Sequence, residues 1–235
     1  WPLHIVEIEP VGSNEANIVW EWHLWDHLIQ DFDSNLPNYG VVSDHPELIN
    51  INYTGVDGLD PLKADWIHAN SIDYNQELDQ ILISSRRFSE IWIIDHSTTS
   101  EEAASNQGGN SGKGGNILYR WGNPAAYNLG EIEDQMLFFQ HDANWIQDGF
   151  IDEKKIMVFN NGTPEQSSSS VNIINPSITE ENTYYLTNGK FGPETIDWEY
   201  TNDYLFSAKI SGAERLANGN TLICSGNQGA FLEVN

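Results

Sequence analysis

Two histidines open similar β-rich segments and are the best candidates for chemistry in this chain. His68 is followed by Ala-Asn-Ser-Ile, and His141 by Asp-Ala-Asn-Trp. A single histidine at the start of a strand is more often structural, but recurrence at the same place in two repeats favours a shared site. Arg86 follows the next apolar run, and two imidazoles with a guanidinium would bind an anion. We predict His68, His141 and Arg86 as catalytic residues, with Asn70 and Asp142 beside them as substrate-binding residues.

Three further histidines have weaker claims to a function. His96 comes just after an apolar run and precedes Ser-Thr-Thr, so it is either a turn residue or a further substrate-binding residue. His23 and His27 are four residues apart, which is a helical spacing for metal ligands, but the sequence offers no evident third ligand. Packing is therefore the preferred interpretation of this pair, and no metal-binding residue is predicted.

The charge of the chain excludes several classes of partner. The 235 residues include 35 Asp and Glu against 10 Lys and Arg, a formal net charge of −25. Such a field repels nucleic acid and anionic membranes, so neither is expected as a partner. Its plain interpretation is solubility in a saline or extracellular medium. Bound structural Ca²⁺ is the alternative, at the acidic turns Asp57–Asp60 and Asp31–Asp33, although neither has the spaced oxygens of an EF-hand loop. No other cofactor is predicted.

The elements that must position these residues are short strands. Helical periodicity is scarce, and runs of β-branched and aromatic residues broken by Gly, Asn and Pro predict an all-β chain. The runs repeat with a period of about 72 residues. The first complete unit has expected strands near 68–72, 80–83, 90–94 and 117–121, and the second near 141–145, 156–159, 171–174 and 196–200. Partial units have expected strands near 3–8 and 17–22, and near 212–216, 221–224 and 231–234.

Units of four antiparallel strands are typical of the blades of a β-propeller, whose innermost strands line a central channel. One blade cannot bury both of its faces alone, so neighbouring blades must stack. We predict a single propeller domain over residues 1–235, with units near 1–60, 61–135, 136–205 and 206–235. The loops at 97–116 and 162–170 are long for a compact domain and are expected to be functional or disordered.

The pattern of strands predicts a propeller that is incomplete at both ends. The sequence opens with what resembles a third strand and closes after another third strand. Open edges favour missing segments of the same polypeptide, a partner chain or self-association through the ends. No apolar run is long enough for a membrane span, and no export signal opens the sequence.

Several segments resemble the bacterial arylsulfotransferase family. They are Asp65–Ile72, Ser84–Arg86, Ile94–Thr99, Leu118–Pro124, Gln140–Trp145, Phe159–Gly162 and Leu216–Cys224. The resemblance runs over the whole chain and implies a six-bladed propeller, exported to the periplasm or the extracellular medium. It also implies transfer of a sulfuryl group from an aryl sulfate to a phenol, without a nucleotide donor and through a sulfohistidine.

The same resemblance assigns individual residues. His68 and His141 match two of the family's charge-stabilising or acid–base histidines, and Arg86 matches its Ser-x-Arg segment. Thr163 follows Phe159–Gly162 where the family generally has an arginine. Gln228 stands where we align the nucleophilic histidine, and a glutamine amide cannot attack sulfur usefully at neutral pH. Gln228 is therefore predicted as a substrate-binding residue. Sulfuryl transfer is thus expected to be impaired, and the alternative is a catalytically silent extracellular propeller that binds ligands or serves as a structural module.

Overall fold

The computed structural model describes residues 2–54, 64–163, 165–176, 178–179 and 183–235. The chain is mostly β, with several small antiparallel sheets. The first sheet is the hairpin β1 (His4–Val11) and β2 (Glu15–His23). The second sheet has the strand order β5 (Ala69–Asn75), β6 (Gln80–Ser85), β7 (Glu90–Asp95) and β8 (Tyr119–Trp121).

The remaining two main sheets follow in chain order. The third sheet has the strand order β14 (Trp198–Thr201), β11 (Ser170–Ile174), β10 (Ile156–Asn160) and β9 (His141–Trp145). The fourth sheet consists of β15 (Gly212–Arg215), β16 (Thr221–Ser225) and β17 (Ala230–Val234). Smaller pairs are the parallel β3 (Leu28–Ile29) with β4 (Ile49–Asn50), and the antiparallel β12 (Leu186–Thr187) with β13 (Lys190–Phe191).

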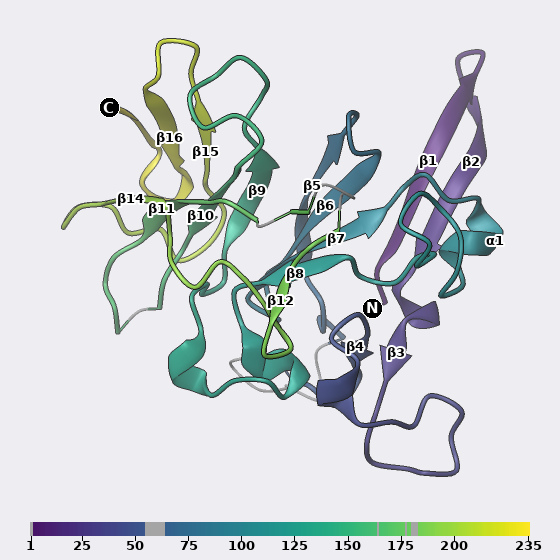
Figure 1. The fold of residues 1–235 in the computed structure, drawn as a ribbon. Coiled ribbons are helices and arrows are strands. Elements are labelled where there is room, and N and C mark those ends of the chain that lie inside the picture. The colour runs from purple at the N-terminus through teal and green to yellow at the C-terminus, as the bar shows by residue number, and fades with distance from the viewer. Residues whose placement is uncertain (1, 55–63, 164, 177, 180–182) are drawn as a thin grey trace.

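The predicted strands of both complete units and of the two partial units are confirmed. Figure 1 shows the four main sheets side by side, from the purple β1–β2 hairpin to the yellow strands near the C-terminus. Within the described residues the sheets do not close into a ring. What is observed is therefore a row of small antiparallel sheets.

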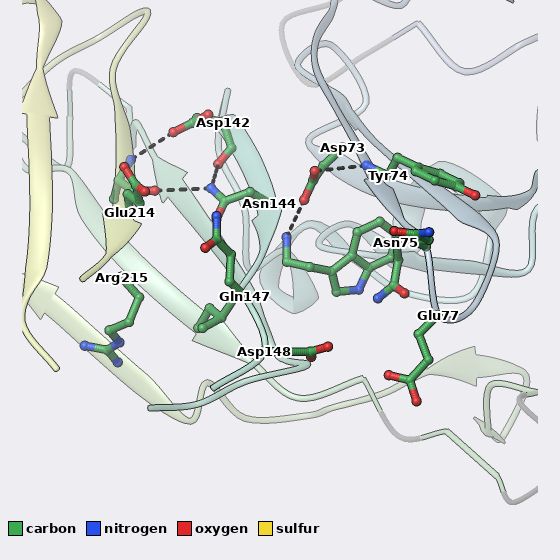
Figure 2. Close-up of a pocket in the computed structure, with 14 residues that line it drawn as sticks. Asp73, Tyr74, Asn75, Glu77, Asp142, Asn144, Gln147, Asp148, Glu214 and Arg215 are labelled. Atoms are coloured by element: carbon green, nitrogen blue, oxygen red, sulfur yellow. Dashed lines mark hydrogen bonds between the residues drawn. The ribbon is translucent and has the colours of Figure 1, made fainter. Parts of the chain in front are cut away.

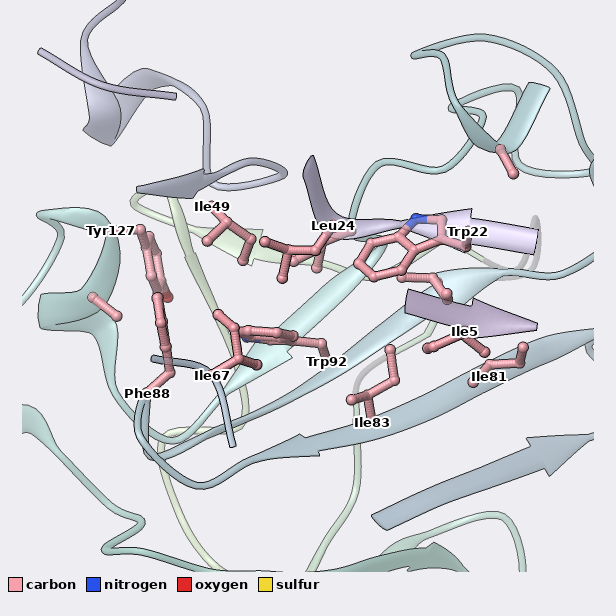
Figure 3. Close-up of a cluster of buried hydrophobic side chains, with 14 of the residues drawn as sticks. Ile5, Trp22, Leu24, Ile49, Ile67, Ile81, Ile83, Phe88, Trp92 and Tyr127 are labelled. Atoms are coloured by element: carbon pink, nitrogen blue, oxygen red, sulfur yellow. The ribbon is translucent and has the colours of Figure 1, made fainter. Parts of the chain in front are cut away.

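The hydrophobic core lies between consecutive sheets, because the middle strands bury both of their faces. In β6, Ile81 and Ile83 contact the cluster shared with the first sheet, while Leu82 belongs to the cluster shared with the third. Alternate side chains of a strand point to opposite faces, so one apolar run serves two interfaces. Figure 3 shows the first of these clusters, in which Trp22 and Trp92 are fully buried.

The loop over residues 97–116 completes the first cluster. It contains the short helix α1 (Ser100–Ala103), whose N-terminus has a capping box between Thr99 and Glu102. Trp22 donates its indole N–H to the Gly115 carbonyl at 2.7 Å, and a Cβ on Gly115 would lie 1.9 Å from the Ala103 oxygen. The loop is thus an ordered cover over a buried tryptophan.

His27 packs under the same loop. Its ring stacks on Trp22 with centroids 5.3 Å apart, and its Nε2 lies 2.8 Å from the Ala103 carbonyl oxygen. The side chain is buried. The packing interpretation is confirmed for His27. His23 follows the buried Trp22 in β2, so its side chain lies on the opposite, more exposed face of the hairpin.

Candidate functional site

His141 is the first residue of β9 and is held at both ring nitrogens. Its Nδ1 lies 2.7 Å from Asn161 Oδ1 and 3.0 Å from the Phe139 carbonyl oxygen, both of which accept a hydrogen bond. Nε2 therefore carries the lone pair, and it accepts the backbone N–H of Ile210 at 3.2 Å. Burial lowers the pKa of His141, so the folded protein favours the neutral ring.

Asn161 orients His141 and is not among the site residues predicted from the sequence. Its side chain is fully buried, and its Nδ2 donates to the carbonyl oxygens of Ser207 and Ile210 at 2.6 and 2.9 Å. The signal that could have found it is a polar Asn-Asn pair directly after the apolar core of β10. One amide thus fixes both the imidazole and the segment that contacts its Nε2.

His68 and Arg86 lie at the same end of the inner strands as His141. The backbone N–H of Arg86 donates to the His68 carbonyl oxygen at 3.1 Å. The Arg86 guanidinium lies over the Phe139 ring, 4.6 Å from its centroid, and Phe139 contacts His141. After burial, the charges of Arg86 and His68 are further causes of the lowered pKa of His141. The three predicted catalytic residues are therefore neighbours.

His68 and His141 occupy positions in their repeats that differ by two residues. The backbone N–H of Arg87 donates to Ile67, and that of Gly162 donates to Phe138 in the same way. His68 thus corresponds to Phe139, and both have left-handed backbone with φ of +50° and +56°. Because of this shift, His68 precedes its strand and is exposed, while His141 lies within its strand and is buried.

The environment of His68 is anionic on one side. Its Nδ1 lies 2.7 Å from Asp65 Oδ2, and the Arg87 Nε lies 3.5 Å from the same oxygen. Partial burial acts to raise the pKa of Asp65, but the hydrogen bond and charge of His68, with Arg87, lower it overall. Asp65 therefore stays ionised and orients the His68 ring, as a carboxylate does in many acid–base pairs.

Asn70 and Asp142 join neighbouring inner strands. Asn70 Nδ2 donates to the Gln140 carbonyl oxygen at 2.7 Å, and Asp142 Oδ2 accepts the backbone N–H of Ala213 at 2.9 Å. Burial raises the pKa of Asp142, and the charges of Asp73 and Glu214 raise it further. Both side chains hold strands together here.

Gln228 belongs to the 3₁₀ turn Gly226–Gln228, which lies against the segment that contacts His141. Its Oε1 accepts the Ser225 hydroxyl and its Nε2 donates to the Tyr204 carbonyl oxygen, both at 2.6 Å. The turn is joined to Ser211 by the Gly226 backbone N–H at 2.9 Å. In this geometry, the amide of Gln228 holds a turn.

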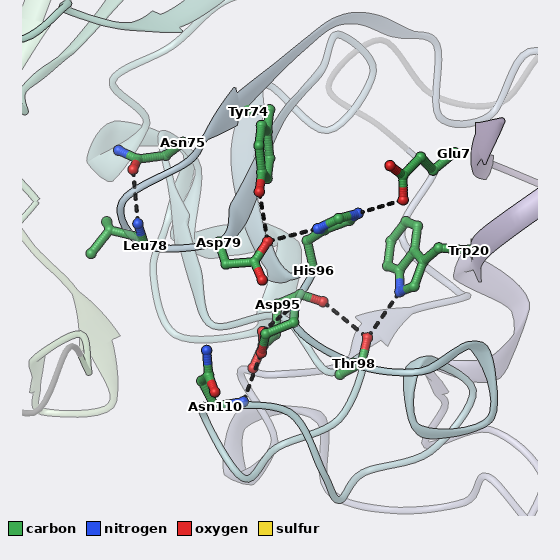
Figure 4. Close-up of polar contacts among 11 residues, drawn as sticks. Glu7, Trp20, Tyr74, Asn75, Leu78, Asp79, Asp95, His96, Thr98 and Asn110 are labelled. Carbon is green, nitrogen blue, oxygen red and sulfur yellow. Dashed lines mark hydrogen bonds and ion pairs between the residues drawn. The ribbon is translucent and has the colours of Figure 1, made fainter. Parts of the chain in front are cut away.

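His96 lies at the opposite end of the second sheet from His68. Figure 4 shows its Nδ1 facing Asp79 and its Nε2 facing Glu7, at 2.7 and 3.3 Å. Its ring packs between Trp20 and Tyr74, the latter near the C-terminal end of β5. A seven-residue strand is about 20 Å long, so His96 is remote from His68 and from Arg86.

The family model described as arylsulfotransferase (ASST) matches residues 4–235. The chain belongs to the arylsulfotransferase family. No curated protein matches it. The chain is similar to a crystal structure of a protein of unknown function from Bacteroides caccae, with 11% identity and a TM-score of 0.31, covering 100% of this chain and 69% of that one.

Membership of the arylsulfotransferase family implies aryl sulfate substrates in general. The groove on the inner strands is poorly suited to such anions. This cavity of about 520 Å³ runs along β5, β9 and β15. Figure 2 shows its acidic lining, which includes Asp73, Glu77, Asp142, Asp148 and Glu214. The nearby Arg215 is bound to Asp152 at 2.6 Å. An anion therefore finds a more favourable field at the His68–Arg86–His141 end.

The acidic turns considered for Ca²⁺ divide into two cases. Asp33 Oδ1 accepts hydrogen bonds from the backbone and side-chain amides of Asn35, at 2.9 and 2.8 Å. Asp57–Asp60 lies outside the described residues. In the part of the chain that the structure describes, no helix is long and apolar enough to cross a membrane.

Proposed function

We propose that this arylsulfotransferase-family chain transfers a sulfuryl group from an aryl sulfate to a phenolic acceptor, with His141 carrying the group between them. The observation that supports this role is the His141 ring itself: buried, oriented by Asn161 through Nδ1, and favoured in its neutral form. A neutral imidazole with a directed Nε2 lone pair is what attack on sulfur requires. This proposal moves the nucleophile away from position 228.

The proposed reaction has two displacement steps. Nε2 of His141 attacks sulfur, the sulfur–oxygen bond to the aryl group breaks, and its electron pair leaves on the phenolate, which takes a proton from His68. The acceptor phenol then attacks the same sulfur and gives its proton to His68. The nitrogen–sulfur bond breaks and returns its electron pair to His141.

Arg86 and His68 have complementary parts in this scheme. The Arg86 guanidinium is fixed over the Phe139 ring and would bind the sulfuryl oxygens, where charge develops during transfer. The half-exposed His68 is oriented by Asp65 and would exchange protons with the phenols. Arg86 is one of 10 Lys and Arg residues against 35 Asp and Glu, and His68 is one of seven histidines.

One contact favours the second candidate function, a silent propeller that binds ligands without turning them over. The Ile210 N–H occupies the lone pair of His141 Nε2, so transfer requires this segment to move. Ile210 has φ of +52°, a left-handed conformation that is costly for a β-branched residue. Relief of this strain would lower the free-energy cost of moving the segment away from His141 when a substrate binds.

The test is turnover of p-nitrophenyl sulfate with a phenol acceptor, together with mapping of the sulfated residue by mass spectrometry. We expect the sulfuryl group on His141, and a loss of at least about 10³-fold in rate for His141→Gln. His45→Gln is the matched control, since His45 is exposed and bound to Glu47 at 2.9 Å. Because burial lowers the pKa of His141, activity should persist below about pH 6.5.

Gln228→His separates the two alignments of the nucleophile. If His141 carries the group, the Gln228→His variant keeps the parent rate and the sulfated residue stays at 141. A large gain in rate with a sulfated residue at 228 would place the nucleophile there instead. Binding of aryl sulfate that depends on Arg86, with no turnover in any variant, would support the silent module.

We further propose that the sheets are blades of a propeller and that the chain works in the periplasm or outside the cell. The stacking of consecutive sheets through shared cores supports the first idea. The net charge of −25 is compatible with the second. Scattering from the native protein would test closure, and cell fractionation would test location.

A further inference from the structure

The first sheet brings together three side chains that the sequence analysis left unconnected. His4 of β1 lies directly opposite His23 of β2, and Glu21 is two residues before His23 on the same strand. Residues two apart in a strand share a face, so all three side chains project from one side of the hairpin. The sequence offered His23 a partner at His27, but the strand register supplies His4 instead.

The three ligand atoms are already close to the separations of a metal site. Glu21 Oε2 lies 3.1 Å from His4 Nε2 and 3.3 Å from His23 Nε2, and all three atoms lie within 4.8 Å of one another. In a tetrahedral site with bonds of about 2.0–2.1 Å, neighbouring ligand atoms are about 3.3 Å apart. The two imidazole rings stack with centroids 3.9 Å apart, and both Nε2 atoms lie against the same Glu21 oxygen.

The scaffold under these ligands is firm. The opposite face of the hairpin carries Ile5, Trp20 and Trp22, which are buried in the first cluster. The Glu21 backbone N–H donates to the Ser100 hydroxyl at 3.2 Å, so the carboxylate strand is also tied to α1. Side chains that project from a packed hairpin lose little freedom when they bind a metal.

We propose that His4, Glu21 and His23 form a binding site for a divalent transition-metal ion of the Zn²⁺ class. Two imidazole nitrogens and one carboxylate match the ligands that zinc takes in sites with an open position for water. Ca²⁺ and Mg²⁺ prefer all-oxygen sites and should bind poorly here. The ligands are partly exposed, with 42%, 37% and 43% of the His4, Glu21 and His23 side chains accessible, so an ion can enter from solvent.

The experiment is calorimetric titration of the whole chain with Zn²⁺, in a buffer with excess Ca²⁺ that occupies unspecific carboxylates. We expect one Zn²⁺ per chain at this site. His4→Gln and His23→Gln should each weaken it by more than tenfold, as loss of a ligand exceeds the about 10–100-fold effect of an outer partner. His45→Gln should leave it unchanged, since the His45–Glu47 pair has the same chemistry without a third ligand among the described residues.

Co²⁺ provides a readout of coordination. Its visible absorption is strong when four ligands surround it, so the parent chain should develop this band and the double variant His4→Gln, His23→Gln should not. Zn²⁺ uptake that is equal in the parent and the double variant overturns the proposal. So does the failure of the parent chain to take up Zn²⁺, and circular dichroism confirms that each variant is folded.

Discussion

The second and third sheets have the same four-stranded order but treat buried polar groups in opposite ways. In the second, Glu90 and Arg120 form a fully buried ion pair, in which Arg120 Nε donates to Glu90 Oε1 at 2.9 Å and Trp92 donates to the other oxygen. In the third, Asn172 of β11 is equally buried, and neither its side-chain nitrogen nor its oxygen has a partner among the described residues.

The repeat therefore specifies the strands, while the buried polar groups differ from sheet to sheet. Burial raises the pKa of Glu90 because it disfavours the ionised carboxylate, and the adjacent Arg120 opposes that effect. The Arg120 Nη1 also reaches the Leu48 carbonyl oxygen at 3.0 Å. The second sheet thus pairs a buried charge with an opposite charge and hydrogen bonds. The third sheet buries an amide without a hydrogen-bond partner among the described residues, which costs free energy.

Removing Arg120 should have the largest effect on stability. Arg120→Ala leaves the Glu90 carboxylate buried without its partner, and we expect a loss of about 3–5 kcal/mol in the free energy of unfolding. Lys154→Ala is the control, because Lys154 and Glu77 are both 59% exposed and such pairs contribute about 0–1 kcal/mol. Urea unfolding measures both, and similar losses in the two variants would contradict the contrast.

Asn161, directly after β10 of the third sheet, is a buried amide that, unlike Asn172, has partners for both its nitrogen and its oxygen. Asn161→Ala removes the shorter of the two hydrogen bonds of His141 Nδ1 and takes the amide donor away from the carbonyls of Ser207 and Ile210. We expect a loss of about 1–3 kcal/mol in stability and at least about tenfold in sulfuryl transfer. Asn161→Gln, which keeps the amide, serves as the conservative variant. If the acid limb of the pH–rate profile shifts in Asn161→Ala and returns to its parent position in Asn161→Gln, Asn161 acts by positioning His141.

Replacing Asn172 should act in the opposite direction. Asn172→Val removes an unpartnered buried amide from β11, and we expect a gain of about 1 kcal/mol in the free energy of unfolding. Thermal unfolding of the parent and the variant at equal concentration measures it. A clear loss of stability would show that the amide is bonded in solution, and would remove this difference between the sheets.

The smallest effect concerns the buried histidines, whose pKa values burial lowers below the usual value of about 6.5. Above that pH these histidines are neutral in both the folded and the unfolded state, so their contribution to stability does not change with pH. As the pH falls below it, the unfolded chain takes protons that the folded chain refuses, and stability decreases. Urea unfolding at pH 7.5 and 5.5 should show a smaller decrease for His27→Gln than for the parent, and equal decreases would refute the assignment.

The strands and their grouping could be predicted because their signals are local. The apolar run Ile91-Trp-Ile-Ile94 is sufficient to predict β7, and the turn Asn218-Gly219 predicts the loop between β15 and β16. The neighbourhood of His68, Arg86 and His141 also followed from the repeat. The predicted equivalence of His68 and His141 was wrong by two residues, because the two similar motifs begin at different positions relative to their strands.

What the sequence determined by itself is the all-β pattern, the repeat, the family and the acidic field, since each depends on residue types along the chain. The groups that each histidine contacts became evident only in the folded chain. His141 faces Asn161 and Ile210, His96 faces Glu7, and His23 faces His4. These partners come from other strands, and a sequence period fixes which face a side chain takes but not what lies across from it.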